Sequence, residues 1–235
     1  MSNKTKIILL CGGRGARLGK ITDTIPKPLV KVKGQSILKH KINNYLKQGY
    51  DNYIVCTGYM GDKIEKEFGL LGYKAVFSNI GINAGILKRI YSVMDQVLAP
   101  VIISYGDTYA EINFDDLMSK HQKSNCLITL VITSIQHPFG LIELDKNNII
   151  SNFNEKPVLN HYIGYAVFEP SLFNSLPKSI INLPDGFGVV EAIKHFMKLG
   201  KVNSYRYGGL QITINTNEDL KLANAKIGNY YTLKD

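Results

Sequence analysis

The segment Leu9-Leu10-Cys11-Gly12-Gly13-Arg14-Gly15-Ala16-Arg17-Leu18 starts at the end of an apolar run, Ile7 to Leu10, and continues into three glycines and two arginines. Such a run is typical of a buried strand. The three glycines that follow it lack Cβ atoms, so the backbone can turn sharply and bring its N–H groups close to an anion. Arg17 in this segment and Lys27 in the sequence Ile25-Pro26-Lys27-Pro28 add positive charge. We therefore expect this loop to bind a triphosphate.

Two common phosphate-binding loops do not match this segment. The dinucleotide pattern G-x-G-x-x-G would need a glycine at Leu18. The P-loop pattern G-x-x-x-x-G-K-[ST] would need one at Arg17 or at Lys20. The pattern that remains is G-G-x-G-x-R-L followed by P-K-P.

Composition places the chain among ordinary globular proteins. Its 235 residues fit one α/β domain, with 45% hydrophobic and 20% charged residues. The formal net charge is +9, but the lysines are spread along the chain without a basic run, which argues against nucleic-acid binding. No apolar run approaches a membrane span, and no signal peptide fits the N-terminus. The three cysteines show no C-x-x-C spacing, so we expect buried thiols in a reducing cytoplasm.

The first half of the chain alternates strands and helices, as in a parallel sheet with right-handed crossovers. Residues 78–89 are expected to lead into a helix that runs to about Leu98, opened by Asn83 or Ala84 with Gly85 near its first turn. N–H groups there could face a base or a phosphate; the alternative is an ordinary capped helix that follows a loop. The other elements expected in this half are helices at 35–48, 61–68 and 113–123, and strands at 53–56, 73–77 and 101–105.

The second half changes to a β-rich pattern. We expect it to form a mixed sheet extension that closes over one side of the ligand cleft, with a hairpin turn at Asp145-Lys146-Asn147-Asn148. Pro157 would end strand pairing and leave Glu155 and Lys156 on an irregular segment. Residues 1–235 are thus predicted to form a single domain, with a nucleotide-binding half (1–125) and an acceptor-binding half (126–235). Further elements are expected as strands at 126–134, 139–144, 149–153, 162–168, 202–207 and 211–214, and helices at 186–199 and 220–227.

Asp107 follows the apolar run Val101-Ile102-Ile103-Ser104-Tyr105 directly after Gly106. Open α/β sheets bind ligands at the carboxyl ends of their strands. A short aspartate at a rigid strand end suits Mg²⁺ that bridges phosphates. We therefore interpret Asp107 as a metal ligand; the alternative is an ordinary turn aspartate.

The composite of the glycine loop, P-K-P and Gly106-Asp107 resembles the signature of the sugar-phosphate nucleotidyltransferases, or nucleotide-sugar pyrophosphorylases. The resemblance extends from about Lys6 to about Ala225. It implies a Rossmann-like nucleotide-diphospho-sugar transferase fold of the α/β class, with a mostly parallel central sheet flanked by helices and a smaller β-rich extension. It also implies an Mg²⁺-dependent transfer in which an acceptor phosphate oxygen attacks the α-phosphorus of a nucleoside triphosphate and pyrophosphate leaves.

The same resemblance assigns roles to individual residues. Arg17, Lys27 and Lys156 are the implied catalytic residues, and Asp107 and Asn215 the implied metal ligands. The implied nucleotide-binding residues are Leu10, Gly12, Gly13, Gly15, Gly85, Tyr105 and Gly106. The implied acceptor-binding residues are Phe139, Gly140, Glu155, Lys156, Gly164 and Tyr165, of which Glu155 and Lys156 match the family's E-K-P motif.

Among subfamilies, the chain is most similar to glucose-1-phosphate cytidylyltransferases. The segments Cys56-Thr57-Gly58-Tyr59-Met60-Gly61 and Gly85-Ile86-Leu87-Lys88-Arg89 look like their C-x-G-Y-K-G and G-R-L-K-R. The implied substrates are CTP and a sugar 1-phosphate or a similar phosphorylated acceptor. The same reaction with GTP or UTP remains an alternative, because Ile86 replaces an arginine and an insert before this element is missing.

Asn215 stands where the family usually carries a second metal aspartate. It offers a carbonyl oxygen but no charge, so we expect weaker metal binding than at a two-aspartate site. This departure leaves open a catalytically weak nucleotide-binding pseudoenzyme. A transferase that uses a finished nucleotide sugar would normally show D-x-D, whereas this chain reads Asp107-Thr108-Tyr109. The expected partners are small molecules, not nucleic acid or membrane, and the sheet extension is a candidate homodimer surface.

Overall fold

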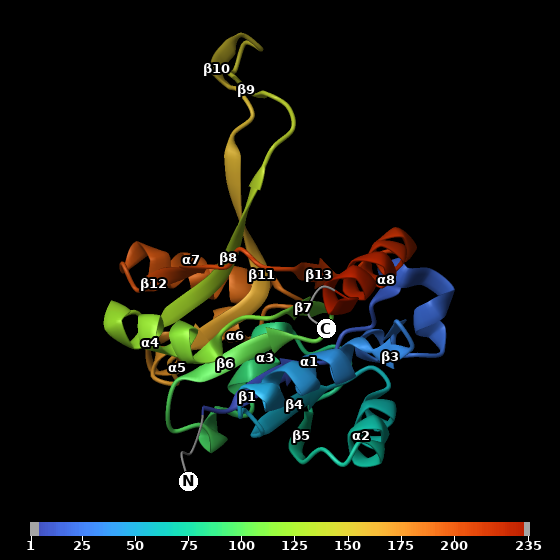
Figure 1. Cartoon of the computed structure of the whole chain (residues 1–235). Helices are drawn as coiled ribbons and strands as arrows, with labels where there is room; N and C mark the ends of the chain where they lie inside the picture. The colour runs from blue at the N-terminus through green and yellow to red at the C-terminus, as the bar shows by residue number, and fades with distance from the viewer. Residues whose placement is uncertain (1–4, 233–235) are drawn as a thin grey trace.

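The apolar runs at Ile7–Leu10 (β1), Tyr53–Thr57 (β4) and Val101–Tyr105 (β6) form the centre of a seven-stranded sheet. The structure is a computed structural model that describes residues 5–232. The strand order is β12-β8-β11-β6-β1-β4-β5 (Figure 1). β6, β1, β4 and β5 run parallel, β11 is antiparallel to both β6 and β8, and β12 is parallel to β8. The expected mostly parallel α/β sheet is therefore confirmed.

Alternating side chains of the central strands divide the core into two layers, because successive residues of a strand point to opposite faces. Ile7 and Leu9 pack in one cluster with buried residues of the helices Ile37–Lys47 (α1), Gly61–Leu70 (α2) and Phe114–Ser124 (α4). Ile8 packs in the other cluster, with residues of the helices Ile86–Tyr91 (α3), Leu172–Ser175 (α5), Lys178–Ile181 (α6) and Phe187–Lys198 (α7). Both faces of the sheet are thus covered by helices, which explains why nearly every residue of the central strands β1, β4 and β6 is buried.

A third, smaller core holds the C-terminal part of the chain against the region that follows β1. It joins Leu18 and Val30 to Ile212 and Ile214. The strand at Gln211–Thr213 (β13) pairs there with the strand at Thr108–Ala110 (β7). This pairing brings the segment around Asn215 next to the end of β6.

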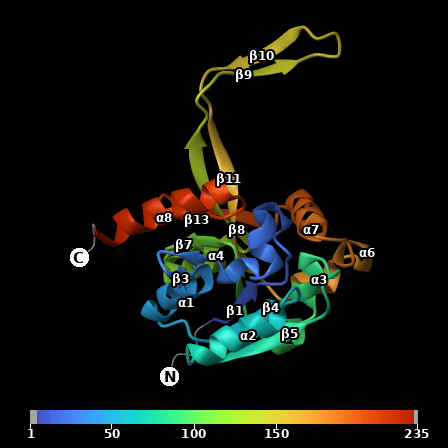
Figure 2. The same ribbon diagram turned by 90° about the vertical axis from the view of Figure 1, so that its right-hand side faces the viewer.

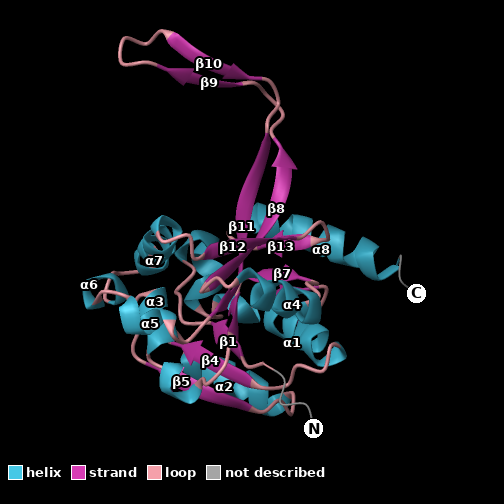
Figure 3. Cartoon of the chain, turned by 90° about the vertical axis from the view of Figure 1, so that its left-hand side faces the viewer, coloured by secondary structure: helices cyan, strands magenta, loops and turns pink. Residues whose placement is uncertain are grey.

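Strands Ile128–Gln136 (β8) and Val158–Phe168 (β11) are longer than the sheet they belong to. Their outer halves leave the body as a two-stranded ribbon that carries the hairpin of Leu141–Leu144 (β9) and Ile150–Asn154 (β10) (Figure 1). The hairpin is bent away from the axis of the ribbon (Figures 2 and 3). We call residues 137–157 the arm. The expectation that the β-rich extension closes over the cleft of its own chain is therefore wrong, because the ribbon stands away from the body.

The helix expected to run to about Leu98 is shorter, since it ends at Tyr91. The hydroxyl of Ser92 donates to the Arg89 carbonyl, and Val93 leaves the helical region with φ −120° and ψ 6°. Serine competes in this way with the helical backbone bonds. Only a 3₁₀ turn, Met94–Gln96 (η3), continues the segment.

The helices and the remaining strands have the following bounds. The α-helices are Ile37–Lys47 (α1), Gly61–Leu70 (α2), Ile86–Tyr91 (α3), Phe114–Ser124 (α4), Leu172–Ser175 (α5), Lys178–Ile181 (α6), Phe187–Lys198 (α7) and Asn217–Thr232 (α8). The 3₁₀ helices are Ala16–Asp23 (η1) and Lys27–Leu29 (η2), and the other strands are Lys31–Val32 (β2), Gln35–Ser36 (β3), Ala75–Asn79 (β5) and Val202–Arg206 (β12). None of the helices within residues 5–232 combines the length and the hydrophobicity that crossing a membrane requires.

Candidate active site

A cavity of about 740 Å³ opens at the carboxyl ends of β1 and β6, where an open α/β sheet is expected to bind its ligand. Loops from distant parts of the chain form its wall. The lining comprises residues 10–17, Lys27, Pro28, residues 82–84, Ile86, Arg89, residues 105–107 and Asp185. Of the predicted nucleotide-binding residues, Leu10, Gly12, Gly13, Gly15, Tyr105 and Gly106 all line this cavity.

The glycine loop needs two of its glycines for different reasons. A Cβ on Gly12 would lie 2.6 Å from Cζ of Arg89, so no side chain fits there without displacing the guanidinium. Gly15 has a φ of +68°, a backbone conformation that favours glycine, and a Cβ there would lie 3.0 Å from Cβ of Lys27. The loop is thus held against two cationic side chains, as a site for polyanions requires.

Arg89 is a component of this cavity that the sequence analysis did not place among the site residues. Its residue is only 4% exposed, and burial lowers the pKa of its guanidinium. The guanidinium donates to the carbonyl oxygens of Thr57 at 2.5 Å, Gly81 at 2.7 Å and Ile82 at 3.2 Å. Arg89 therefore ties the loop after β4 to the loop before α3. Its signal in the sequence was the segment Gly85-Ile86-Leu87-Lys88-Arg89.

Gly85 has a packing role beside the cavity. A Cβ at Gly85 would lie 2.2 Å from the carbonyl oxygen of Leu183. The N–H of Ile86 donates to the carbonyl of Asp185 at 2.7 Å, so this donor at the start of α3 is already used. Asn83 and Ala84, rather than Gly85, line the cavity.

Lys27, Asp107 and Asn215 form the polar centre of the site. The ammonium of Lys27 donates to Oδ2 of Asp107 at 2.5 Å and to Oδ1 of Asn215 at 2.9 Å. The side chain of Lys27 is only 10% exposed and that of Asp107 25% exposed. Two oxygens of the type that Mg²⁺ prefers therefore converge on one cation, and this donor set fits a magnesium ion.

Asp219 holds Asn215 in place. Its carboxylate accepts the N–H groups of Asn215 at 2.8 Å and of Thr216 at 2.9 Å. These hydrogen bonds lower the pKa of Asp219, and the charge of Lys27 acts in the same direction. The start of α8 thus holds the backbone at Asn215, while Lys27 binds both the Asn215 side chain and Asp107.

A buried polar cluster supports the end of β6 from behind. The ammonium of Lys41, which is fully buried, donates to the carbonyl of Thr108 and to the hydroxyl of Tyr165 at 2.6 Å. The Tyr165 hydroxyl also donates to the Thr108 carbonyl at 3.0 Å. Tyr165, predicted as an acceptor-binding residue, therefore lies in the core beside the residue that follows Asp107. Gly164 packs against the Tyr105 side chain.

Cys11 lines the cavity but is not suited to be a nucleophile. Its residue is 1% exposed, and burial raises the pKa of its thiol to about 12. A thiol with this pKa stays protonated at neutral pH, and the thiolate is the reactive form. Cys11 is therefore a buried wall residue of the cavity and not a candidate nucleophile.

Arg17 and Arg14 lie on the open side of the cavity, and both are exposed. Arg14 is 5.8 Å from the centroid of the Tyr59 ring and 4.0 Å from the carboxylate of Asp23. Arg17 lies one residue into the 3₁₀ helix η1. Both side chains line the cavity, and the binding of phosphate by Arg17 stays a prediction.

The structure does not bring the predicted acceptor residues of the arm into this cavity. Phe139, Gly140, Glu155 and Lys156 lie on the arm, and among the described residues none between 108 and 184 lines the cavity. The side chains of Glu155 and Lys156 are 61% and 57% exposed. Their roles, like those of the other candidate residues, remain predictions.

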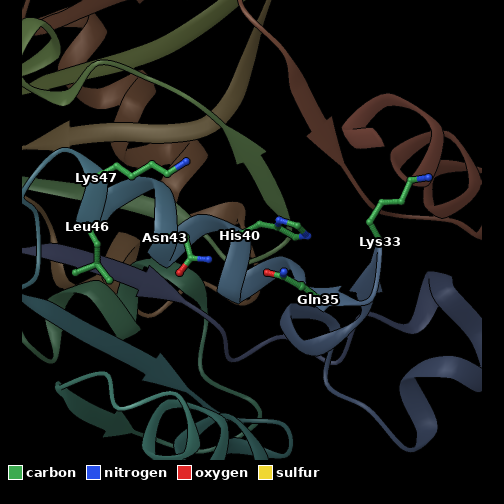
Figure 4. Close-up of a pocket in the computed structure, with 6 residues that line it drawn as sticks. All are labelled: Lys33, Gln35, His40, Asn43, Leu46 and Lys47. Carbon is green, nitrogen blue, oxygen red and sulfur yellow. The ribbon is translucent and has the colours of Figure 1, made fainter. Parts of the chain in front are cut away.

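A second hollow of about 480 Å³ beside α1 does not compete with this site (Figure 4). Its cations Lys33 and Lys47 lie at opposite ends of the group of lining residues and do not converge (Figure 4). His40 there bonds the Val32 carbonyl at 2.9 Å. This hollow therefore lacks the convergent polar groups that mark a binding site.

Comparison with known proteins gives the family. The profile described as "Nucleotidyl transferase" matches residues 6–186. A probable glucose-1-phosphate cytidylyltransferase from Bacillus subtilis is 29% identical over 243 residues, which cover 92% of this chain and 93% of the relative. The mannose-1-phosphate guanylyltransferase catalytic subunit beta from Drosophila melanogaster is 29% identical over 75% of this chain. The chain spans about half (51%) of the length of that second relative.

Solved structures show the same fold. HddC from Yersinia pseudotuberculosis has a TM-score of 0.74 at 18% identity, with 95% of this chain and 100% of that chain covered. A protein assigned as a glucose-1-phosphate thymidylyltransferase from Bacillus anthracis also has a TM-score of 0.74, at 20% identity and with 95% of each chain covered. Together with the profile match over most of its length, these findings show that the chain belongs to the nucleotidyl transferase family.

Proposed function

We propose that the protein joins a nucleoside triphosphate, with CTP favoured, to a sugar 1-phosphate or a similar phosphorylated acceptor, releasing pyrophosphate. The observation that carries this proposal is the convergence of Lys27, Asp107 and Asn215 at the rim of a glycine-lined cavity. The preference for CTP is supported by the Bacillus subtilis relative, and GTP is kept as the alternative because of the guanylyltransferase relatives.

The reaction forms one bond and breaks one. An ionised oxygen of the acceptor phosphate attacks the α-phosphorus, and the bond from that phosphorus to the bridging oxygen breaks, so pyrophosphate leaves with the electron pair. The substrates are both polyanions, so the task of the protein is to hold them together and to offset their repulsion. The glycine-loop N–H groups, Arg17 and Lys27 would do this for the triphosphate.

We include Mg²⁺ in the proposal, with Asp107 and Asn215 as its protein ligands. When bound, it would neutralise charge on the phosphate oxygens. Lys27 contacts the same two side chains, so it can exchange those contacts for phosphate oxygens when nucleotide enters. Lys156 is proposed to bind the acceptor phosphate. The nucleotide substrate and the three reduced thiols favour a cytoplasmic location.

The test is pyrophosphate release, with CTP, UTP, GTP, ATP and dTTP each combined with a panel of phosphorylated acceptors. We expect release with one pair, with CTP preferred. Arg17→Ala and Lys27→Ala should each lower kcat/KM on the order of 10²-fold or more, the scale for losing one preorganised charge contact. Lys20→Ala is the matched control, because Lys20 is exposed on the same 3₁₀ helix as Arg17 and does not line the cavity.

Near-normal turnover in the Arg17 and Lys27 variants would contradict the assignment. Nucleotide binding without pyrophosphate release for any pair would favour the alternative of a nucleotide-binding pseudoenzyme. The specific observation behind that alternative is the neutral Asn215 side chain opposite Asp107.

A further inference from the structure

The arm leaves the body at the same edge of the sheet that carries the cavity. Tyr165 of β11 pairs with Ser104 near the carboxyl end of β6, and β11 runs antiparallel to β6. The part of β11 before Tyr165 therefore continues past that edge, paired with β8 as far as Val158 and Gln136. At about 3.3 Å per residue, Val158 lies roughly 20 Å beyond the level of Tyr165. The arm thus leaves the body at the same carboxyl edge of the sheet at which the cavity lies.

The arm and the ribbon that carries it expose many apolar side chains to solvent. Eight large apolar residues along them are between 52% and 72% exposed: Ile135, Phe139, Ile142, Leu144, Ile149, Ile150, Phe153 and Val158. A two-stranded hairpin alone is marginally stable in water, and this many exposed large apolar residues on one projecting segment indicate an interaction site. At about 100 Å² per exposed side chain, this surface approaches the roughly 800 Å² per partner of a standard interface.

The predicted acceptor residues are assembled on the arm itself. A Cβ on Gly140 would lie 3.0 Å from Oε2 of Glu155, so the backbone at Gly140 faces that carboxylate. The ammonium of Lys156 lies 3.8 Å from Oε1 of Glu155. Glu155 and Lys156 and the cavity form the two parts of the proposed site. Within one chain, these two parts are separate.

The mouth of the cavity carries apolar residues that match the arm. Ile82, which lines the cavity, is 53% exposed. Phe187 and Val190 at the start of α7, just after the lining residue Asp185, are 64% and 46% exposed. Phe187 and Val190 are three residues apart on a helix and so share one face. An arm that docks there would cover apolar surface on both sides.

We propose that two copies of this chain form a two-fold dimer in which each arm docks at the cavity mouth of the other copy and supplies Glu155 and Lys156 to its site. A second copy is the occupant that the geometry favours, because the cavity that lacks these residues and the arm that carries them belong to the same sequence. In a two-fold pair whose cavity edges face each other, both arms project towards the partner's cavity, and both exchanges form together. This inference rests on the proposed function for the roles of Glu155 and Lys156.

Complementation between two inactive variants tests the exchange. Lys27→Ala damages the cavity and Lys156→Ala damages the arm, so each variant alone should be nearly inactive. In an equilibrated mixture of equal amounts, hybrid dimers pair the intact cavity of one chain with the intact arm of the other. Random reassortment should restore about a quarter of the wild-type activity, because half of the dimers are hybrids with one complete site each. If each arm served its own chain, the mixture would stay as inactive as its components.

Oligomeric state and cross-linking give readouts that do not depend on turnover. The wild type should be a dimer by light scattering, and Phe153→Ser should shift it towards monomer, whereas Leu98→Ser should not, since Leu98 is 98% exposed away from the arm. In a Cys126→Ala background, Asn83→Cys at the cavity and Asn152→Cys on the arm should cross-link between chains when the two variants are mixed. Cys11 and Cys56 are buried and should not react.

The outcomes separate the two proposals. A wild type that releases no pyrophosphate refutes the proposed function, while the cross-link still decides the exchange. An active wild type that is a monomer refutes the exchange. An active dimer also refutes the exchange if the mixed variants show neither recovered activity nor a cross-link while tagged chains show that the subunits have reassorted.

Discussion

Gly12 and Gly13 are neighbours with the same side chain, yet the structure places different demands on them. A Cβ at Gly12 would lie 2.6 to 2.8 Å from three atoms of the Arg89 guanidinium, whereas a Cβ at Gly13 would meet nothing within 4 Å. The guanidinium cannot move aside at low cost, because it is buried and donates to three carbonyl oxygens. The loop therefore packs against Arg89 at Gly12 and is open at Gly13.

Gly12→Ala should displace Arg89 and weaken both folding and nucleotide binding. We expect a loss of about 1–3 kcal/mol in the free energy of unfolding, the usual cost of overpacking, and a lower affinity for the triphosphate. Urea unfolding and calorimetric titration with the preferred nucleotide measure the two effects. Gly13→Ala is the control and should leave stability within about 0.5 kcal/mol of the wild type. Equal losses in the two variants would show that Arg89 does not set the requirement for glycine.

Asn215 lies at the position where a second carboxylate would act on a metal, and its Oδ1 already contacts the Lys27 ammonium. Asn215→Asp should raise the affinity of the nucleotide-bound protein for Mg²⁺ on the order of tenfold, because a charged oxygen replaces a neutral one. Metal titration in the presence of a non-reacting nucleotide analogue measures this. Asn217→Asp adds the same charge at an exposed residue of the same segment and should change the affinity little. A similar gain in both variants would mean that net charge, not ligation, is responsible.

At the scale of elements, His121 anchors helix α4 to two strands of the sheet. Its residue is 1% exposed, with Nδ1 at 2.8 Å from the Thr129 hydroxyl of β8 and Nε2 at 3.2 Å from the Glu169 carboxylate, which follows β11. Burial lowers the pKa of the imidazole from 6.5, and the hydrogen bond to Glu169 opposes this shift. The neutral ring fits both contacts, because Nδ1 can accept from the hydroxyl while Nε2–H donates to the carboxylate.

The lowered pKa of His121 predicts how the stability of the protein depends on pH. The unfolded chain binds the proton more readily than the folded chain. The contribution of His121 to the free energy of unfolding is therefore present above about pH 6.5 and falls as the pH drops through that value. His121→Gln keeps hydrogen-bonding atoms but does not titrate, so its free energy of unfolding should decline less between about pH 7.5 and 5.5. Urea unfolding at the two pH values measures this. His161→Gln, at an exposed position on β11, should keep the wild-type slope; an unchanged slope in His121→Gln would refute the assignment.

At the scale of the whole molecule, the body and the arm differ in what stabilises them. Among the described residues, no buried core residue lies between Val131 and Ile163, although β8 and β11 still pair there from Ile132 with Tyr162 to Gln136 with Val158. The inner halves of both strands are packed in the two main core layers. The arm thus takes little part in the cooperative core of its own chain.

Replacing residues 137–157 with a two-residue Asn-Gly turn should therefore leave a folded body. The new turn would join Gln136 and Val158, which already face each other in the ribbon, and Asn-Gly suits a two-residue hairpin. We expect one cooperative unfolding transition with a Tm within about 5 °C of that of the full-length Phe153→Ser variant, because dimerisation stabilises the wild type. Thermal unfolding followed by circular dichroism measures it, with the full-length monomeric Phe153→Ser variant as the reference. Loss of cooperativity would show that the arm belongs to the folding unit.

The sequence by itself determined those features that depend on local pattern. Apolar runs predicted the central parallel strands, and the glycines after Leu10 and the aspartate after Gly106 predicted a ligand site at the carboxyl edge, where the cavity lies. These features follow from strand periodicity and from the position of a residue within its own element. The residues Leu10 to Arg17, Lys27 and Asp107 could be brought to one site by this reasoning.

Tertiary structure decided what depends on contacts between distant segments. Lys27 contacts Asn215 across a sequence separation of 188 residues. This contact, the carbonyl contacts of Arg89 and the burial of Tyr165 follow from how strands pair and cores pack, which no local pattern specifies. The direction of the arm is the clearest case. Its strands were predictable, but whether Glu155 and Lys156 return to their own cavity depends on the register of β8 and β11 beyond the sheet edge. That register is set by long-range pairing, and it holds the two halves of the proposed site apart within one chain.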